Sequence, residues 1–168
     1  MKVKDIMTKD IVYINPNATV TEAAQLMQKH NIGSVPVCEQ NKLIGIVTDR
    51  DIVVRNIANG MNPINTKVRD VMTSQVASAT PDMDVSDVAS IMSQKQIRRM
   101  PVIESNNLVG IVSLGDMATN PYTDTEASHA LSEISFPSKP VWFNAEKYLI
   151  SNILYYILTK ASRSLLLL

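Results

Sequence analysis

Apolar and polar positions follow one pattern that occurs twice along the chain. In the first copy, one helical face is predicted from apolar residues at the i, i+3, i+4, i+7 spacing: Val20, Ala23, Ala24 and Met27. Thr19 and Glu22 have the spacing of a capping box, in which each side chain satisfies a free amide at the start of a helix. The second copy predicts a matching face from Val85, Val88, Ala89 and Met92.

Short apolar runs rich in β-branched residues surround this helix. Residues 11–14 precede it across an Asn-Pro turn, and residues 35–38 and 43–48 follow it, separated by an Asn41-Lys42 turn. A further helix is expected from Asp49 toward Arg55. Each copy therefore predicts the order β-α-β-β-α, and the fold class is α/β in the broad sense (α+β).

The two copies align without a gap when the chain is shifted by 65 residues. Residues 3–52 fall on residues 68–117, and counting the aligned pairs gives 18 identities in 50 positions. A unit of about fifty residues buries little surface alone, so the duplication predicts two copies that share a core with pseudo-two-fold symmetry. The expected division is repeat 1 at 1–60, a linker at 61–67, repeat 2 at 68–120 and a C-terminal extension at 121–168.

The extension has no counterpart in the duplication. Residues 125–135 predict a short helix whose apolar side chains would pack: Ala127, Ala130, Leu131 and Ile134. The tail 141–168 is strongly apolar, but its apolar core of about eleven residues is shorter than the roughly twenty of a membrane span. Three interpretations stay open: a helix docking on this chain or a dimer mate, an interfacial membrane anchor, or sequence foreign to the duplicated core.

Composition narrows the function classes. Sixteen basic residues balance sixteen acidic ones, so the surplus of positive charge typical of nucleic-acid binding is absent. Cys38 is the single cysteine, and His30 and His129 lie in unrelated contexts, so no metal site is expected. The first residues lack the apolar core of a signal peptide, which favours a cytoplasmic location.

The repeated landmarks resemble those of a known family. Paired Asp-(Ile/Val)-Met-Thr openings, a Pro-Val strand and a Gly-Ile-Val-(Thr/Ser)-x-x-Asp ending occur twice in register. They are similar to a tandem cystathionine-β-synthase (CBS) domain pair, or Bateman module, of the free-standing bacterial kind. The resemblance covers about residues 1–120. It implies two clefts that bind AMP, ADP, ATP, S-adenosylmethionine or dinucleotides as regulatory ligands, with no required cofactor, and it implies homodimerisation.

The ends of the repeated strands are the candidate ligand-binding positions. The Thr48 and Ser113 hydroxyls suit a phosphate or ribose oxygen, and the Asp51 and Asp116 carboxylates suit the two hydroxyls of a ribose. This is also the role that the resemblance implies for them. The same pairs are good helix caps, and capping and ligand binding are compatible with one another.

The resemblance implies further contacts. Val12 and Ala77 would offer backbone groups to adenine, and Arg99 would grip a phosphate with its planar guanidinium. Because Gly33 and Ser34 occupy the places of Arg98 and Arg99 in the first copy, the two clefts are expected to be unequal. The apolar wall would comprise Ile32, Val35 and Pro36 in one copy and Ile97, Met100 and Pro101 in the other, although ordinary core residues would give the same pattern.

Three function classes follow. The leading hypothesis is an adenosine-nucleotide sensor that acts through a ligand-dependent conformational change on a regulated protein. The alternative is an interaction or scaffold protein whose clefts are vestigial. Catalysis is disfavoured, because the sequence has no nucleophile–base pair, metal cluster or phosphate-binding loop.

Overall fold

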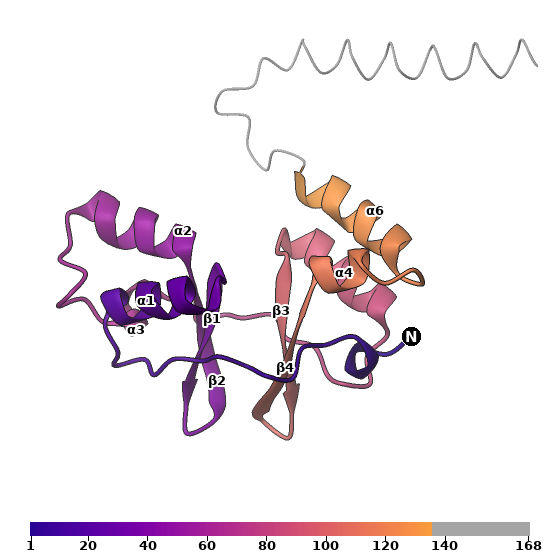
Figure 1. Cartoon of the computed structure of the whole chain (residues 1–168), viewed down its shortest axis with the longest axis horizontal. Coiled ribbons are helices and arrows are strands. Elements are labelled where there is room, and N and C mark those ends of the chain that lie inside the picture. Colours follow the sequence, from indigo (N-terminus) through magenta and orange to yellow (C-terminus); the bar gives the residue numbers. More distant parts are fainter. Residues whose placement is uncertain (136–168) are drawn as a thin grey trace, which may run out of the picture. The chain divides into compact units, whose positions relative to one another are not determined.

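The structure, a computed structural model, describes residues 1–135. The apolar tail predicted at 141–168 lies outside the described residues. Helices and strands form two similar halves, each with one hairpin and its own hydrophobic core (Figure 1). The predicted mixed α+β class is confirmed.

The first repeat is a helix followed by a hairpin and a second helix. Helix α1 (Val20–His30) begins at Thr19, which accepts from the Glu22 amide, and ends at Asn31 in the left-handed conformation, with φ 51°. Strands β1 (Ser34–Glu39) and β2 (Lys42–Thr48) pair antiparallel. Helix α2 (Asp49–Asp51) continues as a π-helical turn (Ile52–Asn56) and a 3-10 turn (Ile57–Asn59), beyond the expected end near Arg55.

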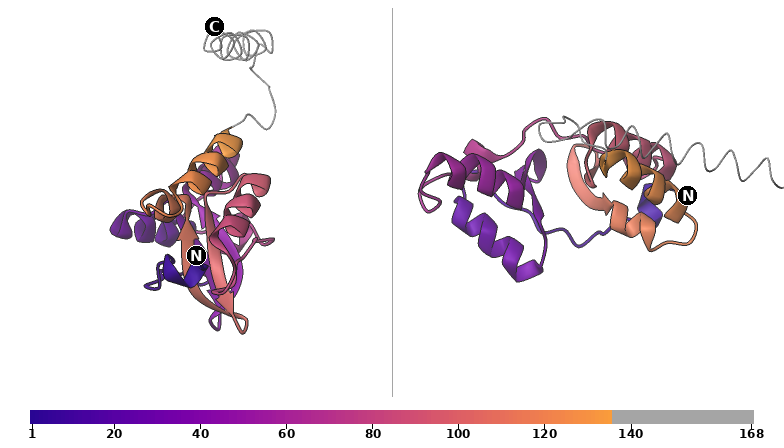
Figure 2. Two further views of the ribbon diagram at one scale, coloured as in Figure 1. Left: turned by 90° about the vertical axis from the view of Figure 1, so that its right-hand side faces the viewer. Right: turned by 90° about the horizontal axis from the view of Figure 1, so that it is seen from above.

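The second repeat has the same frame with one more helix. Helix α4 (Val85–Lys95), strands β3 (Arg99–Glu104) and β4 (Asn107–Ser113) and helix α5 (Leu114–Ala118) repeat the order of the first copy. Helix α6 (Asp124–Ser135) follows, as the apolar spacing at 125–135 predicts. Figures 1 and 2 show α6 lying against α4, and α6 also contacts α5.

Residues 11–14 do not form the predicted strand. Within them Ile14 alone pairs with the hairpin, in a single parallel bridge to Val37 on β1. The Asn15-Pro16 turn follows at once, and proline has no amide with which to extend the pairing. Ala79 makes the equivalent single bridge to Val102 in the second copy. The prediction of a regular first strand in each repeat is therefore wrong.

The opening segment of each repeat packs on the other repeat. The 3-10 helix Val3–Asp5 lies beside the second repeat (Figures 1 and 2), where Val3 is buried in its core and donates its amide to the Met83 carbonyl at 3.0 Å. Helix α3 (Val68–Val71) buries its two valines in the first repeat's core, and the Val68 amide donates to the Ala18 carbonyl at 2.8 Å. The two repeats therefore have separate cores rather than the one shared core predicted, and each core is completed by residues from the opening segment of the other copy.

Burial of the predicted helical faces differs between the copies. All four predicted residues of α4 are buried, whereas Ala24 on α1 is exposed, because α6 covers α4 and no described helix covers α1 in the same way. On α6, Ala127 and Ala130 are buried and Leu131 is 48% exposed, so the prediction that Leu131 packs is also wrong. Cys38 is a buried core residue as expected, and burial raises the pKa of its thiol.

Candidate nucleotide site

The first junction, residues 48–51, connects β2 to α2. The Thr48 amide and hydroxyl both donate to Oδ2 of Asp51, at 3.0 and 2.7 Å, and the Asp51 amide donates back to the Thr48 hydroxyl at 3.1 Å. This is a complete capping box, as the capping alternative predicts. One carboxylate oxygen, Oδ1 of Asp51, is left for another donor.

The second junction, residues 113–116, connects β4 to α5 with the same geometry. The Ser113 amide and hydroxyl donate to Oδ2 of Asp116 at 2.7 and 2.8 Å, and the Asp116 amide donates to the Ser113 hydroxyl at 3.2 Å. Both Asp116 and Ser113 are half-buried. The structure therefore brings the predicted hydroxyl and carboxylate together twice, each time with a second carboxylate oxygen outside the cap.

Arg55 is a contact of the first junction that the sequence interpretation missed. Its Nη2 lies 3.3 Å from Oδ1 of Asp51, and its Nη1 donates to the Val71 carbonyl at 2.8 Å and to the Thr73 hydroxyl at 3.2 Å. The i, i+4 spacing of Asp51 and Arg55 on a helix is a signal for the ion pair. No local spacing reveals the contacts to residues 71 and 73, because they depend on the exchange of opening segments.

Arg99 lies beside the second junction. In the β3–β4 hairpin it is directly opposite Ser113, and residues so paired have Cβ atoms about 5 Å apart. Ser34 takes the same place opposite Thr48 in the first repeat. Arg98 and Arg99 are both exposed, and Arg98 uses its carbonyl to accept the Leu114 amide. Only the second junction therefore has a guanidinium in the cross-strand position.

The first junction carries an additional carboxylate. Asp49 occupies the position of Leu114, and its Oδ2 lies so close to Gly33 that a Cβ there would approach it to 2.9 Å. The first junction thus has two carboxylates, of which Asp51 is paired with Arg55, whereas the second has Asp116 with Arg99 in the adjacent cross-strand position. The charge around the second junction is more favourable to an anion.

The residues predicted to hold adenine fall into two groups. Val35 and Met100 are 0% exposed and belong to the two cores, which favours the core interpretation for these two side chains. Pro36 and Pro101 are also buried, and their carbonyls accept the Ile14 and Ala79 amides. The remaining predicted positions are half-buried beside the hairpins: Val12, Ile32, Ala77 and Ile97.

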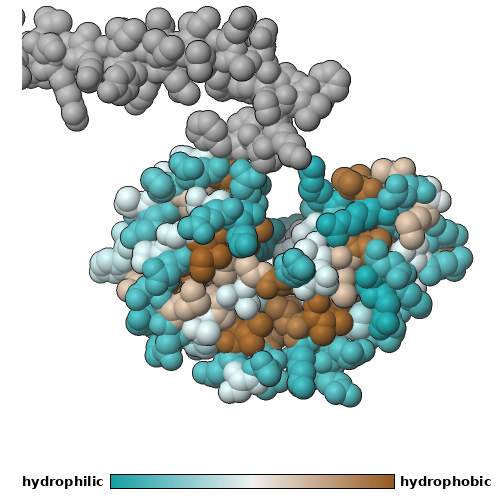
Figure 3. All heavy atoms as spheres, turned by 180° about the vertical axis from the view of Figure 1, so that it is seen from behind, coloured by the Kyte–Doolittle hydropathy of each residue, from teal (hydrophilic) through white to brown (hydrophobic). Residues whose placement is uncertain are grey.

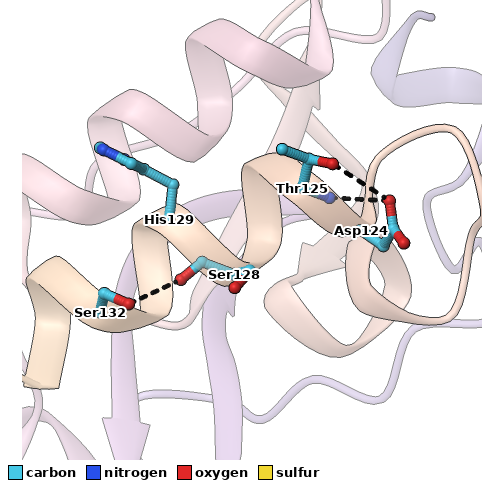
Figure 4. A pocket seen from close by; sticks show the side chains of 5 residues that line it. All are labelled: Asp124, Thr125, Ser128, His129 and Ser132. Carbon is cyan, nitrogen blue, oxygen red and sulfur yellow. Dashed lines mark hydrogen bonds between the residues drawn. The ribbon is translucent and has the colours of Figure 1, made fainter. Parts of the chain in front are cut away.

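Two shallow hollows lie away from both junctions, on the outer surface of the second repeat. One is lined by α6 alone, where Figure 4 shows the side chains on the helix surface: Asp124, Thr125, Ser128, His129 and Ser132. The other lies along α4 and α6. Figure 3 shows one face of the molecule, on which apolar side chains gather near the middle and polar side chains border them. Neither hollow is lined by a residue of either junction, so neither coincides with the candidate nucleotide site.

Comparison with known proteins identifies the family. The CBS domain family model matches residues 3–56 and 68–121, one match for each repeat. The chain belongs to the CBS domain family. The CBS domain-containing protein YhcV of Bacillus subtilis (strain 168) is 47% identical over 133 residues, covering 79% of this chain and 94% of that protein. The alignment therefore spans nearly all of that CBS domain-containing protein.

Solved structures of CBS proteins support the fold. Hypoxic Response Protein I, solved with two coordinated zinc ions, has a TM-score of 0.67 at 32% identity, covering 72% of this chain and all of that chain. The CBS domain pair of protein MJ0100, solved in complex with 5′-methylthioadenosine and S-adenosyl-L-methionine, has a TM-score of 0.64 at 33% identity. The match covers 70% of this chain and 93% of that chain.

Among residues 1–135 of this chain, no three His, Cys, Asp or Glu side chains cluster as metal ligands. Over the same residues, no helix is long and apolar enough to cross a bilayer.

Proposed function

We propose that this CBS pair is a regulatory sensor that binds an adenosine-containing small molecule at the two junctions. The carrying observation is the duplicated Thr/Ser–Asp geometry, in which one oxygen of each carboxylate holds the helix cap and the other is outside it. A carboxylate oxygen accepts hydrogen bonds from the hydroxyls of a ribose. The complex of the related MJ0100 pair with two adenosine-containing molecules supports the same ligand class.

The second junction is the better candidate for a phosphorylated ligand. Arg99 lies opposite Ser113, where a guanidinium can form two parallel hydrogen bonds to a phosphate. The ligand set then includes AMP, ADP and ATP as well as S-adenosylmethionine. Adenine would lie against the half-buried positions Ile97 and Ala77 at this junction, and against Ile32 and Val12 at the first.

A sensor without catalysis follows from the chemistry of these groups. The Asp51 and Asp116 carboxylates are held by their own caps, and neither cap includes a histidine, lysine or cysteine to activate a nucleophile. Ligand binding would instead change the geometry of two repeats that share their opening segments. The alternative is a scaffold protein, which the complete caps and the buried Val35 and Met100 favour.

The test is thermal unfolding with adenosine, AMP, ADP, ATP and S-adenosylmethionine. A ligand at 100 times its Kd stabilises the folded state by about 2.7 kcal/mol, a readable rise in Tm. Asp51→Asn and Asp116→Asn should each reduce the ligand-induced rise, whereas Glu133→Ala on the exposed surface of α6 should leave it unchanged. Arg99→Ala should weaken the binding of AMP more than the binding of adenosine. Arg98→Ala, at the neighbouring position, is the control and should not show this difference. No rise with any of these compounds would favour the scaffold alternative, and turnover of AMP or ATP would contradict the absence of catalysis.

A further inference from the structure

Arg55 connects two segments that lie far apart in the sequence. One of its amino groups lies beside Oδ1 of Asp51, the oxygen that the cap leaves free. The other amino group donates to the Val71 carbonyl and the Thr73 hydroxyl. We call residues 71–73 the crossing segment, because they end the opening of the second repeat and lie on the first. Arg55 therefore joins the first junction to the crossing segment through a single side chain.

The backbone that carries Arg55 is firmly anchored. Arg55 lies in the π-helical turn Ile52–Asn56, an uncommon geometry that is frequent near functional sites. The next residue, Asn56, is fully buried and donates to the Thr66 hydroxyl at 3.0 Å, which in turn donates to the Asn62 carbonyl at 2.9 Å. Since this turn is held in place, a change at Asp51 is accommodated by the Arg55 side chain rather than by the helix.

The second repeat has no such group. The position of Arg55 is taken by Asn120, whose Oδ1 accepts the Tyr122 amide at 3.0 Å and whose Nδ2 lies 3.6 Å from the Met1 sulfur. Among residues 1–135, no cation forms an ion pair with Asp116. The two carboxylates thus have the same cap and different outer neighbours.

The presence of Arg55 at one carboxylate only affects how each junction would bind the two hydroxyls of a ribose. A charge-assisted hydrogen bond from a guanidinium is stronger than one from a hydroxyl, so a ribose at Asp51 competes with Arg55 and a ribose at Asp116 does not. The Asp51 side chain is 13% exposed and that of Arg55 is 45% exposed, so Arg55 is the partner that can turn into solvent. When it turns away, the Val71 carbonyl and the Thr73 hydroxyl lose their donor.

The crossing segment is bonded to the first repeat's hairpin. Thr73 and Ile46 on β2 exchange two backbone hydrogen bonds, at 2.8 and 2.9 Å, in an isolated bridge. We propose that Arg55 is a specificity-determining residue that weakens the first junction for adenosine and couples its occupancy to the crossing segment. The proposal rests on the proposed function, and it assigns the order of filling: the second junction first.

Calorimetric titration with adenosine tests the order of filling. The Asp116→Asn protein keeps only the first junction intact, and the Asp51→Asn protein keeps only the second. The Asp51→Asn protein should bind adenosine more tightly than the Asp116→Asn protein. In the Asp116→Asn protein, Arg55→Gln should tighten adenosine binding by roughly 1.5-fold to fivefold, the range of a partly exposed ion pair. Lys29→Gln, which removes an exposed cation from α1, is the charge-matched control and should change nothing.

Equal or weaker adenosine binding in the Arg55→Gln protein would overturn the proposed specificity role. If neither single-junction protein nor the wild type binds adenosine, the proposed function fails and the order of filling fails with it. The coupling has a separate readout in ligand-free protein, hydrogen exchange of the Thr73 and Ile46 amides. Arg55→Gln should accelerate both amides severalfold relative to wild type and Lys29→Gln. Unchanged exchange would overturn the coupling, whatever the titration shows.

Discussion

The two repeats share one helix–hairpin frame and differ in what surrounds it. Helix α4 is covered by α6, whereas α1 leaves Ala24 in solvent and the helix after the first junction exposes Val53, Val54 and Ile57. The second repeat also receives the N-terminal segment through two ion pairs, Lys2–Asp84 and Lys4–Asp82, which have no equivalent among the described contacts of the first. A duplicated sequence thus gives one reinforced copy and one more open copy.

The same difference extends to the junctions. Both keep the hydroxyl–carboxylate cap within a few tenths of an ångström, so the cap is a property of the repeat itself. Arg55 and Arg99 each occur in one copy only, where Arg55 pairs with Asp51 and Arg99 lies opposite Ser113. Two sites with the same cap and different adjacent arginines can differ in ligand preference.

The largest expected effect comes from placing a charge at the same position of the two helices. Ala89 is 5% exposed beneath α6, so Ala89→Asp buries a carboxylate without a partner and should lower the free energy of unfolding by about 3 kcal/mol. Ala24→Asp, at the exposed equivalent, should cost under about 1 kcal/mol, mainly through the lower helix propensity of aspartate. Urea unfolding of both variants measures the difference. Equal losses would show that α6 does not protect α4 in solution.

The second expected effect concerns the crossing of the opening segments. A Cβ added at Gly45 would lie 2.5 Å from the Met72 sulfur and 3.0 Å from the Thr73 carbonyl oxygen, and one at Gly110 would lie 2.6 Å from the Met7 sulfur and 3.3 Å from the Thr8 oxygen. Methionine side chains can move aside, but backbone oxygens cannot. Gly45→Ala should therefore lower the free energy of unfolding more than Gly110→Ala does. Both should fall within about 1–3 kcal/mol of unfolding free energy.

Thermal and urea unfolding of these two glycine variants separates the crossing from ordinary surface effects. Gly60→Ala is unsuitable as a control, because Gly60 has a φ of 68° and any side chain there is strained. Gly115→Ala is the better control, since its nearest contact is an ordinary 3.4 Å from the Ser113 hydroxyl. If Gly45→Ala and Gly110→Ala were as stable as Gly115→Ala, the opening segments would not lie against the strands as the structure has them.

Local features of the fold were predictable from the sequence, and contacts between the copies were not. The α1 capping box and both hairpins depend on residues within a few positions of one another, and each was found where expected. Residues 11–14 have strand-forming composition, yet they pair at one residue because the turn at Pro16 ends the pairing. Ala24 and Ala89 have the same type and spacing, and only the cover by α6 distinguishes them.

The candidate site follows the same division. Spacing alone predicted that the Thr48 hydroxyl would meet the Asp51 carboxylate, and hairpin register places Arg99 opposite Ser113. Arg55 has two partners, sixteen and eighteen residues away, on a segment that belongs by sequence to the other repeat. Such a contact is visible only once the exchange of opening segments is known.

The smallest expected effect is a pH dependence confined to the cap of α1. The Thr19 amide, and then its hydroxyl, hydrogen-bond to Glu22 and lower the pKa of that carboxyl below its ordinary value of 4.5. At the start of α4, the N-cap Asp84 makes no side-chain bond to the helix and is instead held by Lys2. A carboxyl with a lowered folded pKa stabilises the fold above its unfolded pKa, and that stabilisation is lost as pH falls through the folded value.

Glu22→Gln removes this titration and therefore isolates it. Wild type should be slightly more stable than Glu22→Gln at pH 7, and the difference should shrink as pH falls below about 4.5, because protonated Glu22 no longer accepts both Thr19 bonds as a carboxylate. Urea unfolding of the two proteins at pH 7 and pH 3 gives the comparison. A difference that stays constant between these pH values would show that the Thr19–Glu22 bonds do not form in solution, and the two helix starts would then be alike.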